Sequence, residues 1–497
     1  MIVNRAMFPI QTGFQQITGM QQRLATLQVQ LATGQKAASL AEMGNDRVPE
    51  LAIRTRQSAI AGYQASIGTV ELRLEVASQV MSRLDKIESE ARSSAIGGAG
   101  SSGVNMAALP GLSRARLDEV LTLLNTDVAG RHLFGGGKTQ DKPVAGSAAI
   151  LDGENGRDGF ASVANQRRLA DLGDGLGRLG ASVSGASVTL SEDGAHPFGF
   201  KLSTVSSTSA AVSLVEPMGT AQDQLSVSFA ANPIAGETVS IALTLPDGSS
   251  SVVKLTAVTG APQPGEFAIG IDAVETAQNF KQALDETLTA LGKTVLPAAS
   301  NFAAAENFFA GQGQPVLRVD GPPYETATAL VAATAADTVL WYGGEDSAAP
   351  RQSVTARIDE STQVSYGVQA NEHGIVELVR SLAAMAVETY PAADATAPER
   401  FAALADRQRL RLAESNDGQA GSLEVIGMEL GIAQSTLGHA KERHTAYKAQ
   451  LDTMLEELSS VTTEEVAMEM LALNTRLQAS YQATAMVMQL SFVNYVK

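Results

Sequence analysis

Apolar residues recur every three or four positions near both ends of this 497-residue chain. Between residues 10 and 31, and again between 466 and 488, the mean step is close to the roughly 3.5-residue spacing of helices that pack knobs into holes. The period is absent between about 141 and 366. Isolated helices are marginal in water, because most of their stability comes from packing an apolar face. The two ends are therefore predicted to pair with each other, with other chains, or with both.

Glycines and β-branched residues mark where the helices are predicted to end. Gly34 follows the N-terminal pattern, a glycine-rich stretch occupies 97–103, and Val461, Thr462 and Thr463 interrupt the C-terminal pattern. Further helices are predicted, in chain order, at 60–84, 113–129, 372–388, 398–414 and 426–458.

The middle of the chain has a different pattern. Alternating apolar residues on both sides of Pro246-Asp247-Gly248 predict a β-hairpin within 239–257. Other predicted strands lie at 267–271, 339–342 and 354–366, and predicted helices at 273–291 and 299–309. We therefore expect an α+β insert with largely antiparallel strands.

The predicted fold class is mainly α with an α+β insert. The N- and C-terminal helices are expected to pair as a coiled coil and a helical bundle, with a β-containing outward domain in the middle. The predicted parts are 1–45 with 459–497 as the terminal coiled-coil region, 46–140 with 367–458 as the helical bundle domain, and 141–366 as a variable outer domain.

Charge and cysteine content exclude several classes of protein. The formal net charge is −17, and residues 141–365 hold 25 acids and 12 bases, a net of −13. An acidic middle disfavours nucleic acid as a partner. Because the chain has no cysteine, disulfides and thiolate metal sites are excluded. Without a run of 18 apolar residues or a secretory signal pattern, neither a membrane span nor a cleaved signal peptide is expected.

Three short motifs resemble phosphate-, dinucleotide- and zinc-binding motifs but lack the neighbouring residues or elements that these functions need. The Gly-Gly-Gly-Lys-Thr at 135–139 has His132 where a phosphate-binding loop needs its first glycine. Residues 175–180 fit a dinucleotide fingerprint, but strand-like sequence follows instead of a helix. His439 and His444 lack the spacing of a zinc-binding pair, and His444 is expected to be a packed, hydrogen-bonded residue. No catalytic, cofactor-binding or metal-binding residue is predicted, and an enzyme is not expected.

Four segments resemble the flagellin family. Gln-Leu-Ala-Thr-Gly-Gln-Lys at 30–36 is similar to the family's N-terminal Leu-Ser/Ala-Thr-Gly-Lys/Arg segment, and 477–483 is similar to its C-terminal helix. Gly-Arg-His-Leu-Phe-Gly-Gly at 130–136 resembles a Gly-Arg-Tyr-Leu/Ile-Phe-Gly/Ser-Gly segment typical of the hook–filament junction type. The ending Gln-Leu-Ser-Phe-Val-Asn-Tyr-Val at 489–496 resembles that type's Leu-Ser-Leu-Leu-Asn-Tyr-Leu. Residues 37–46 depart from the family's usual Asn-Ser-Pro/Ala-x-Asp-Asp.

This resemblance implies a structural subunit of the bacterial flagellum that serves motility by self-assembling into a ring between hook and filament. The implied partners are copies of itself, a neighbouring hook-associated protein, flagellin, the flagellar export apparatus and an export chaperone. The implied location is extracellular, reached through the flagellar secretion system without a cleaved signal peptide. Two alternatives stay open: filament flagellin itself, which subunit copy number would distinguish, and a surface-displayed binding module carried by the insert, which glycan binding by residues 141–365 would reveal.

The residues expected to form the assembly surface share the apolar helical spacing of the two ends. They are Ile10, Phe14, Ile17, Leu24, Leu27, Leu31, Val466, Leu473, Leu477, Tyr481, Met488, Leu490, Phe492 and Tyr495.

Overall fold

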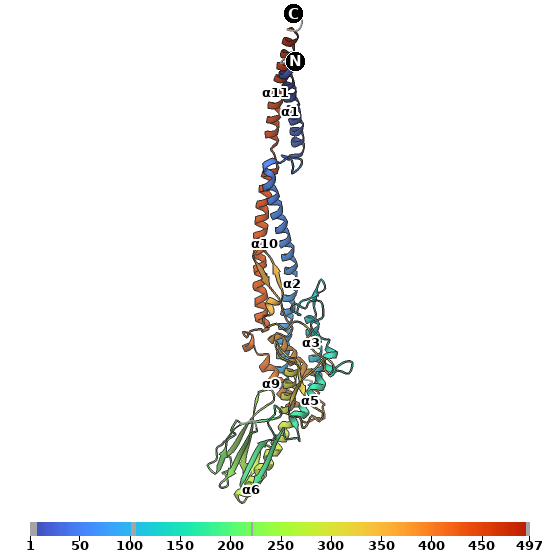
Figure 1. The fold of residues 1–497 in the computed structure, drawn as a ribbon. Helices are drawn as coiled ribbons and strands as arrows, with labels where there is room; N and C mark the ends of the chain where they lie inside the picture. The colour runs from blue at the N-terminus through green and yellow to red at the C-terminus, as the bar shows by residue number, and fades with distance from the viewer. Residues whose placement is uncertain (1–6, 101–105, 220–221, 494–497) are drawn as a thin grey trace. The chain divides into compact units, whose positions relative to one another are not determined.

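The computed structural model describes residues 7–100, 106–219 and 222–493, and the side chains of 12–95, 106–219 and 222–488. It is mainly helical, with long helices near both ends and a β-containing region between them (Figure 1). The coarse fold class predicted from the sequence is therefore confirmed. The chain divides into two compact units: Met1–Thr69 with Arg357–Gln363 and Thr436–Lys497, and Val70–Ala356 with Val364–Ser435. The predicted division into three parts stays a prediction.

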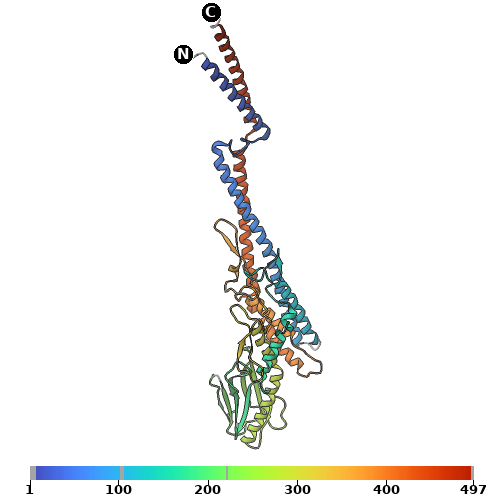
Figure 2. The same cartoon turned by 45° about the vertical axis from the view of Figure 1, so that its right-hand side comes forward.

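The first unit contains two antiparallel helix pairs. Helix α1 (Met7–Thr33) runs beside α11 (Thr463–Val493), as both ribbon views show (Figures 1 and 2). The start of α2 (Arg47–Gly100) contacts the end of α10 (Leu423–Ser459), and the short 3₁₀ turn η1 (Gly44–Asp46) precedes α2. Helix α1 ends where the sequence predicts, because Gly34 takes the left-handed conformation with φ 69°.

The α2–α10 pair has an apolar core and one buried histidine. Ile53 and Ile60 of α2 pack with Leu451 of α10. The His444 ring stacks on Tyr63 with centroids 5.6 Å apart, and its Nε2 donates to the Ile358 carbonyl oxygen at 2.7 Å. The prediction of a packed, hydrogen-bonded His444 is confirmed.

The helices of the second unit come from both sides of the insert. They are α3 (Leu109–Leu124), α4 (Ser147–Asp152), α5 (Phe160–Leu172), α6 (Ala273–Lys293), α7 (Val295–Phe308), α8 (His373–Ala386) and α9 (Ala397–Arg411), with 3₁₀ turns η2 (Met106–Ala108), η3 (Pro350–Ser353) and η4 (Glu414–Asn416). The predicted helices at 273–291, 372–388 and 398–414 are confirmed within a few residues. The end of α2, around Ala95, packs with α7, α8 and α9 in one core, in which Phe302 and Phe401 are fully buried.

Two four-stranded sheets make up most of the β structure. One has the order β3-β4-β7-β6 and is antiparallel throughout; the other has the order β10-β9-β8-β5, and only β9 and β10 run parallel. The strands are β3 (Leu179–Ser184), β4 (Ser187–Glu192), β5 (Lys201–Ser207), β6 (Val212–Val215), β7 (Gln224–Phe229), β8 (Thr238–Thr244), β9 (Ser250–Val258) and β10 (Glu266–Ala268).

Both sheets and α6 share a single hydrophobic core. It includes Leu190 of β4, Ile241 of β8 and Phe280 of α6, each at most 1% exposed. Alternate residues of β8 and β9 point into it, which is the pattern that predicted the hairpin around Pro246-Asp247-Gly248. Gly177 lies against this core with φ 66°, and a Cβ there would lie 2.4 Å from the Phe200 ring.

Three small hairpins complete the fold: β1 (Asp127–Val128) with β2 (Arg131–His132), β11 (Leu317–Val319) with β12 (Leu330–Ala332), and β13 (Thr355–Arg357) with β14 (Gln363–Ser365). The helix predicted at 113–129 is too long. It ends at Leu124, because the Asn125 side chain bonds the backbone of Val144 and Ala129 takes a turn conformation with φ 54°.

The strand predicted at 339–342 is also wrong. Only a bridge between Val144 and Tyr342 forms there. Trp341 is nevertheless buried, with its ring against Phe309 and its Nε1 donating to the Ala310 carbonyl oxygen at 3.3 Å. The apolar residues that suggested a strand are buried by this aromatic packing.

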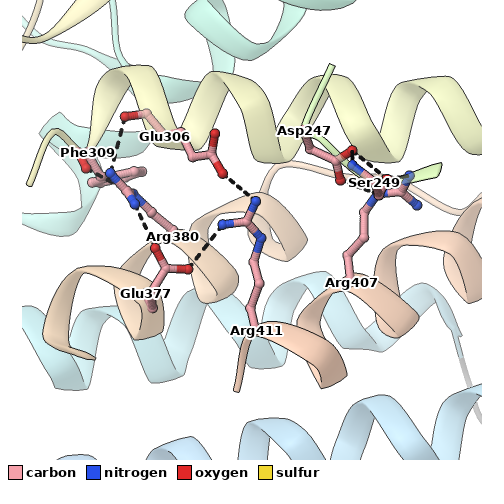
Figure 3. Close-up of polar contacts among 8 residues, drawn as sticks. All are labelled: Asp247, Ser249, Glu306, Phe309, Glu377, Arg380, Arg407 and Arg411. Carbon is pink, nitrogen blue, oxygen red and sulfur yellow. Dashed lines mark hydrogen bonds and ion pairs between the residues drawn. The ribbon is translucent and has the colours of Figure 1, made fainter. Parts of the chain in front are cut away.

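Two arginines one turn apart tie α9 to other elements of the second unit (Figure 3). Arg407 Nε donates to Asp247 Oδ2 in the β8–β9 turn at 2.6 Å, and its Nη2 donates to Ser249 Oγ at 2.9 Å. Arg411 bonds Glu306 of α7 and, at 3.2 Å, Glu377 of α8. We call these contacts the α9 ion-pair strap.

Burial and charge act against each other on the carboxyl groups of this strap. Burial works to raise the pKa of Asp247, but the Arg407 charge and hydrogen bonds from Ser249 hold it below its ordinary value. The pKa of Glu377 is likewise lowered, because Arg380 and Arg411 outweigh its burial. Both groups are therefore ionised at neutral pH and stabilise α9 only while their arginines are present.

Candidate assembly interface

The α1–α11 pair buries one apolar face of each helix. Ile17 and Leu27 of α1 are buried, as are Val466 and Leu477 of α11. Leu24 and Leu473 are half-buried on the same faces. These six predicted assembly residues therefore lie on the faces where the two helices meet within one chain.

Polar contacts set the register of the pair. Gln21 Nε2 donates to the Tyr481 hydroxyl at 2.7 Å, and Arg23 Nη2 pairs with Glu469 Oε1 at 2.8 Å. Both contacts are exposed, so each contributes at most about 1 kcal/mol. They support an antiparallel arrangement whose stability comes mainly from the buried apolar faces.

Other predicted residues lie away from these faces. Phe14, Leu31, Tyr481 and Met488 are exposed. On α11 the buried face continues from Leu477 through Ser480 and Thr484 rather than through Tyr481 and Met488. The reason is geometric, since steps of three and four residues must alternate to stay on one face.

Four predicted assembly residues lie partly or wholly outside the described residues. The side chains of Ile10, Leu490 and Phe492 lie outside the described set, although these residues belong to α1 and α11. Tyr495 lies outside the described ranges altogether.

The opposite face of α11 carries a second apolar stripe. Met468, Leu471 and Met486 are 68%, 71% and 63% exposed. They lie on one side of the helix with small residues between them. One shallow groove there is bordered by Met468, Leu471, Ala472, Thr475 and Ala479, together with Arg476. Met468 is two residues beyond Val466, which turns it about 200° around the helix axis. We call this surface the outer α11 stripe.

The residues of the outer α11 stripe are not among the predicted assembly residues. Its signal was available, because Met468, Ala472, Thr475, Ala479 and Met486 also step by threes, fours and a seven. Alanine and threonine make this second series weaker in hydrophobicity than the first. Small residues nevertheless allow another helix to approach closely, so the stripe is the more informative surface for assembly.

The segment that follows α1 lies beside the segment that joins α10 to α11. Lys36 N donates to the Ser459 carbonyl oxygen at 2.7 Å, and Val461 N donates to the Gly34 carbonyl oxygen at 3.0 Å. The Gln30 side chain, which is mostly buried, donates to the Lys36 carbonyl oxygen at 2.5 Å. This two-strand joint connects α1 to the segment before α2, and α10 to α11.

The glycine-rich motif at 135–139 is filled by the protein's own side chain. Gly137 N donates to Glu345 Oε2 at 2.5 Å, and Lys138 Nζ donates to the Gly344 carbonyl oxygen at 3.1 Å. The motif follows the β1–β2 hairpin, and the one at 175–180 leads into β3 instead of a helix. Neither motif therefore has the strand–loop–helix arrangement that phosphate binding needs.

Across the described ranges, no three His, Cys, Asp or Glu side chains come together in a way that could hold a metal ion. None of the helices in the described parts of the chain has the length and hydrophobicity needed to cross a bilayer.

In comparisons with known proteins, no family model matches the chain, and no curated protein matches it. The assignment of a function therefore depends on the interface geometry and on the segment resemblance.

Proposed function

We propose that this chain is a structural subunit of the bacterial flagellum, of the flagellin type, that self-assembles into a ring joining hook to filament. The observation that carries the proposal is the pairing of the two chain ends in one antiparallel helix pair that still exposes a second apolar stripe. A helix with two apolar faces needs two partners, and α1 supplies only one.

In this proposal α1 and α11 form a two-stranded coiled coil, and the outer α11 stripe packs against the next subunit. Helix α1 also exposes apolar side chains, since Phe14 and Val29 are both about half exposed. Repeated contacts between identical chains of this kind generate rings or filaments.

The junction role is supported by the segments at 130–136 and 489–496, which resemble the junction type. The first of them follows α3 and includes β2 and the buried Phe134, where the chain leaves the helices for the insert.

The interface is tested by charge placed on opposite faces of α11. Leu471→Asp should abolish self-assembly of the purified chain, because it puts a carboxylate into the stripe. Its free energy of unfolding should change by less than about 0.5 kcal/mol, because Leu471 is exposed in the monomer. Asn474→Asp adds the same charge to an exposed position off the stripe and should assemble normally. Sedimentation and electron microscopy would follow assembly, and equal assembly of both variants would refute the interface.

The place in the flagellum is tested by deleting the gene and examining the cells by electron microscopy. A junction subunit should leave hooks without filaments. Loss of filaments with junctions intact would indicate filament flagellin instead.

A further inference from the structure

A cavity of about 430 Å³ lies in the second unit where four helical segments meet. Its walls come from α5, the α6–α7 junction and the start of α9. The size falls within the range typical of small-molecule sites. We call it the α5–α9 cavity.

The floor of the cavity is apolar. Leu169 and Leu172 of α5 and Leu296 of α7 border it, and the two α5 leucines keep part of their surface accessible. Covering Leu169 and Leu172 with a ligand would contribute roughly 25 cal/mol per Å² of apolar area removed from water, whereas Leu296 is already buried.

The rim is cationic, in contrast to the strongly acidic chain. Arg168, Lys293 and Arg400 border the cavity, and Asp394 is the acidic side chain among its lining residues. Asp394 is already bound by Arg400 at 2.8 Å, and the buried Glu388 pairs with both Arg168 and Arg400. Three positive charges therefore face two carboxylates that are held within the wall.

Hydrogen-bond donors remain unused at this rim. Arg168 donates to Glu388 and Asn165, which uses two of its five N–H groups. Within the described ranges Lys293 forms no ion pair, and the buried Nε of Arg400 has no hydrogen-bond partner. Arg400 Nε is closed off from solvent, but an anionic ligand group in the cavity would accept hydrogen bonds from the remaining N–H groups of Arg168 and from Lys293.

We propose that the α5–α9 cavity binds an amphiphilic carboxylate, with the carboxylate at Arg168 and Lys293 and the apolar chain on Leu169 and Leu172. A planar carboxylate matches the guanidinium fork, whereas an amine would be repelled by the rim. This site is independent of the outer α11 stripe and of assembly.

Matched ligands test the proposal on the full-length monomer. Calorimetric titration with octanoate, octylamine and octanol keeps the chain length and changes only the head group. Octanoate should bind saturably and at least roughly tenfold more tightly than the other two. Equal binding of all three, or no saturable binding of octanoate, would overturn the proposal.

Variants then locate the site. Lys293→Glu should weaken octanoate binding by about tenfold or more while lowering the thermal transition only slightly, because Lys293 is exposed and its place in the last turn of α6 is worth about 1 kcal/mol or less. Lys254→Glu makes the same change at an exposed lysine of β9, away from the cavity, and should bind like the wild type. If the Lys293 variant also binds like the wild type, octanoate binds elsewhere and the assignment is wrong.

Discussion

Helix α9 carries one arginine in a buried ion pair and one in an exposed ion pair, so the contributions of the two pairs to the free energy of unfolding can be compared. Arg407 and Asp247 have side chains that are 10% and 3% exposed, with 2.6 Å between Nε and Oδ2. Arg409 and Asp406 are 48% and 61% exposed, with 3.6 Å between their nearest charged atoms. Arg407→Leu should lower the free energy of unfolding by about 3–5 kcal/mol, because it leaves Asp247 buried and uncompensated. Arg409→Leu should change it by less than about 1 kcal/mol.

Urea unfolding followed by circular dichroism, at pH 7 and at pH 4, measures both effects. In the wild type the lowered pKa of Asp247 gives stability that is present at neutral pH and is lost only as pH falls through that pKa. Without Arg407, burial dominates and raises the pKa of Asp247. The penalty of Arg407→Leu should therefore shrink at pH 4, where Asp247 becomes protonated.

The double variant Arg407→Leu/Asp247→Leu completes the test. It should recover much of the lost stability, because no unpaired charge stays buried. The reasoning is refuted if Arg407→Leu costs no more than Arg409→Leu, or if its cost is the same at both pH values.

Three further outcomes are expected. Gly177→Ala should cost at least about 3 kcal/mol in unfolding experiments, against about 1–2 kcal/mol for Gly185→Ala, since both glycines have positive φ but only the first is crowded. Burial and nearby carboxylates raise the pKa of Glu88 to about 8, so the wild type loses stability as pH rises through that value and Glu88 ionises. The free energy of unfolding of Glu88→Gln relative to wild type should therefore grow between about pH 5 and 9. A constant difference would contradict this. Cysteines replacing Leu24 and Leu473 should form an intramolecular disulfide under mild oxidation, visible on non-reducing gels, because both are half-buried in the α1–α11 contact and the pairing of Gly13 with Thr484 and of Gly34 with Val461 puts them at about the same level; absence of the bond would contradict the pairing.

Local sequence signals predicted the parts of the fold that depend on local rules. Gly34 ends α1 because only a residue tolerant of positive φ fits there, and Pro246-Asp247-Gly248 marks the β8–β9 turn. The strands β5 to β7 were not predicted. These strands are rich in serine, which is common in loops, but Ser187 of β4 and Ser228 of β7 face each other across the two strands, and their hydroxyl oxygens lie 2.8 Å apart.

The assembly surface could be predicted only in part. A period of 3.5 identifies the face of α11 that α1 covers, as Val466 and Leu477 show. It does not identify the outer α11 stripe, because Met468 and Met486 are separated by alanines, threonine and glutamine, whose exposure depends on where α1 lies. The α5–α9 cavity could not be predicted either, since Arg168, Lys293 and Arg400 are brought together by tertiary packing.

The two-strand joint at residues 34–36 and 459–461 has a consequence for how this chain can change in evolution or by engineering. Its backbone hydrogen bonds hold the end of α1 beside the start of α11. An insertion of a few residues in one of these helices would shift the residues beyond it along the other helix by about 1.5 Å per residue. Segments 7–33 and 463–493, which lie more than 400 residues apart in the chain, therefore form one exchangeable cassette. A chimera that takes only one of them from another protein should lose the helix pair, whereas one that takes both should keep it.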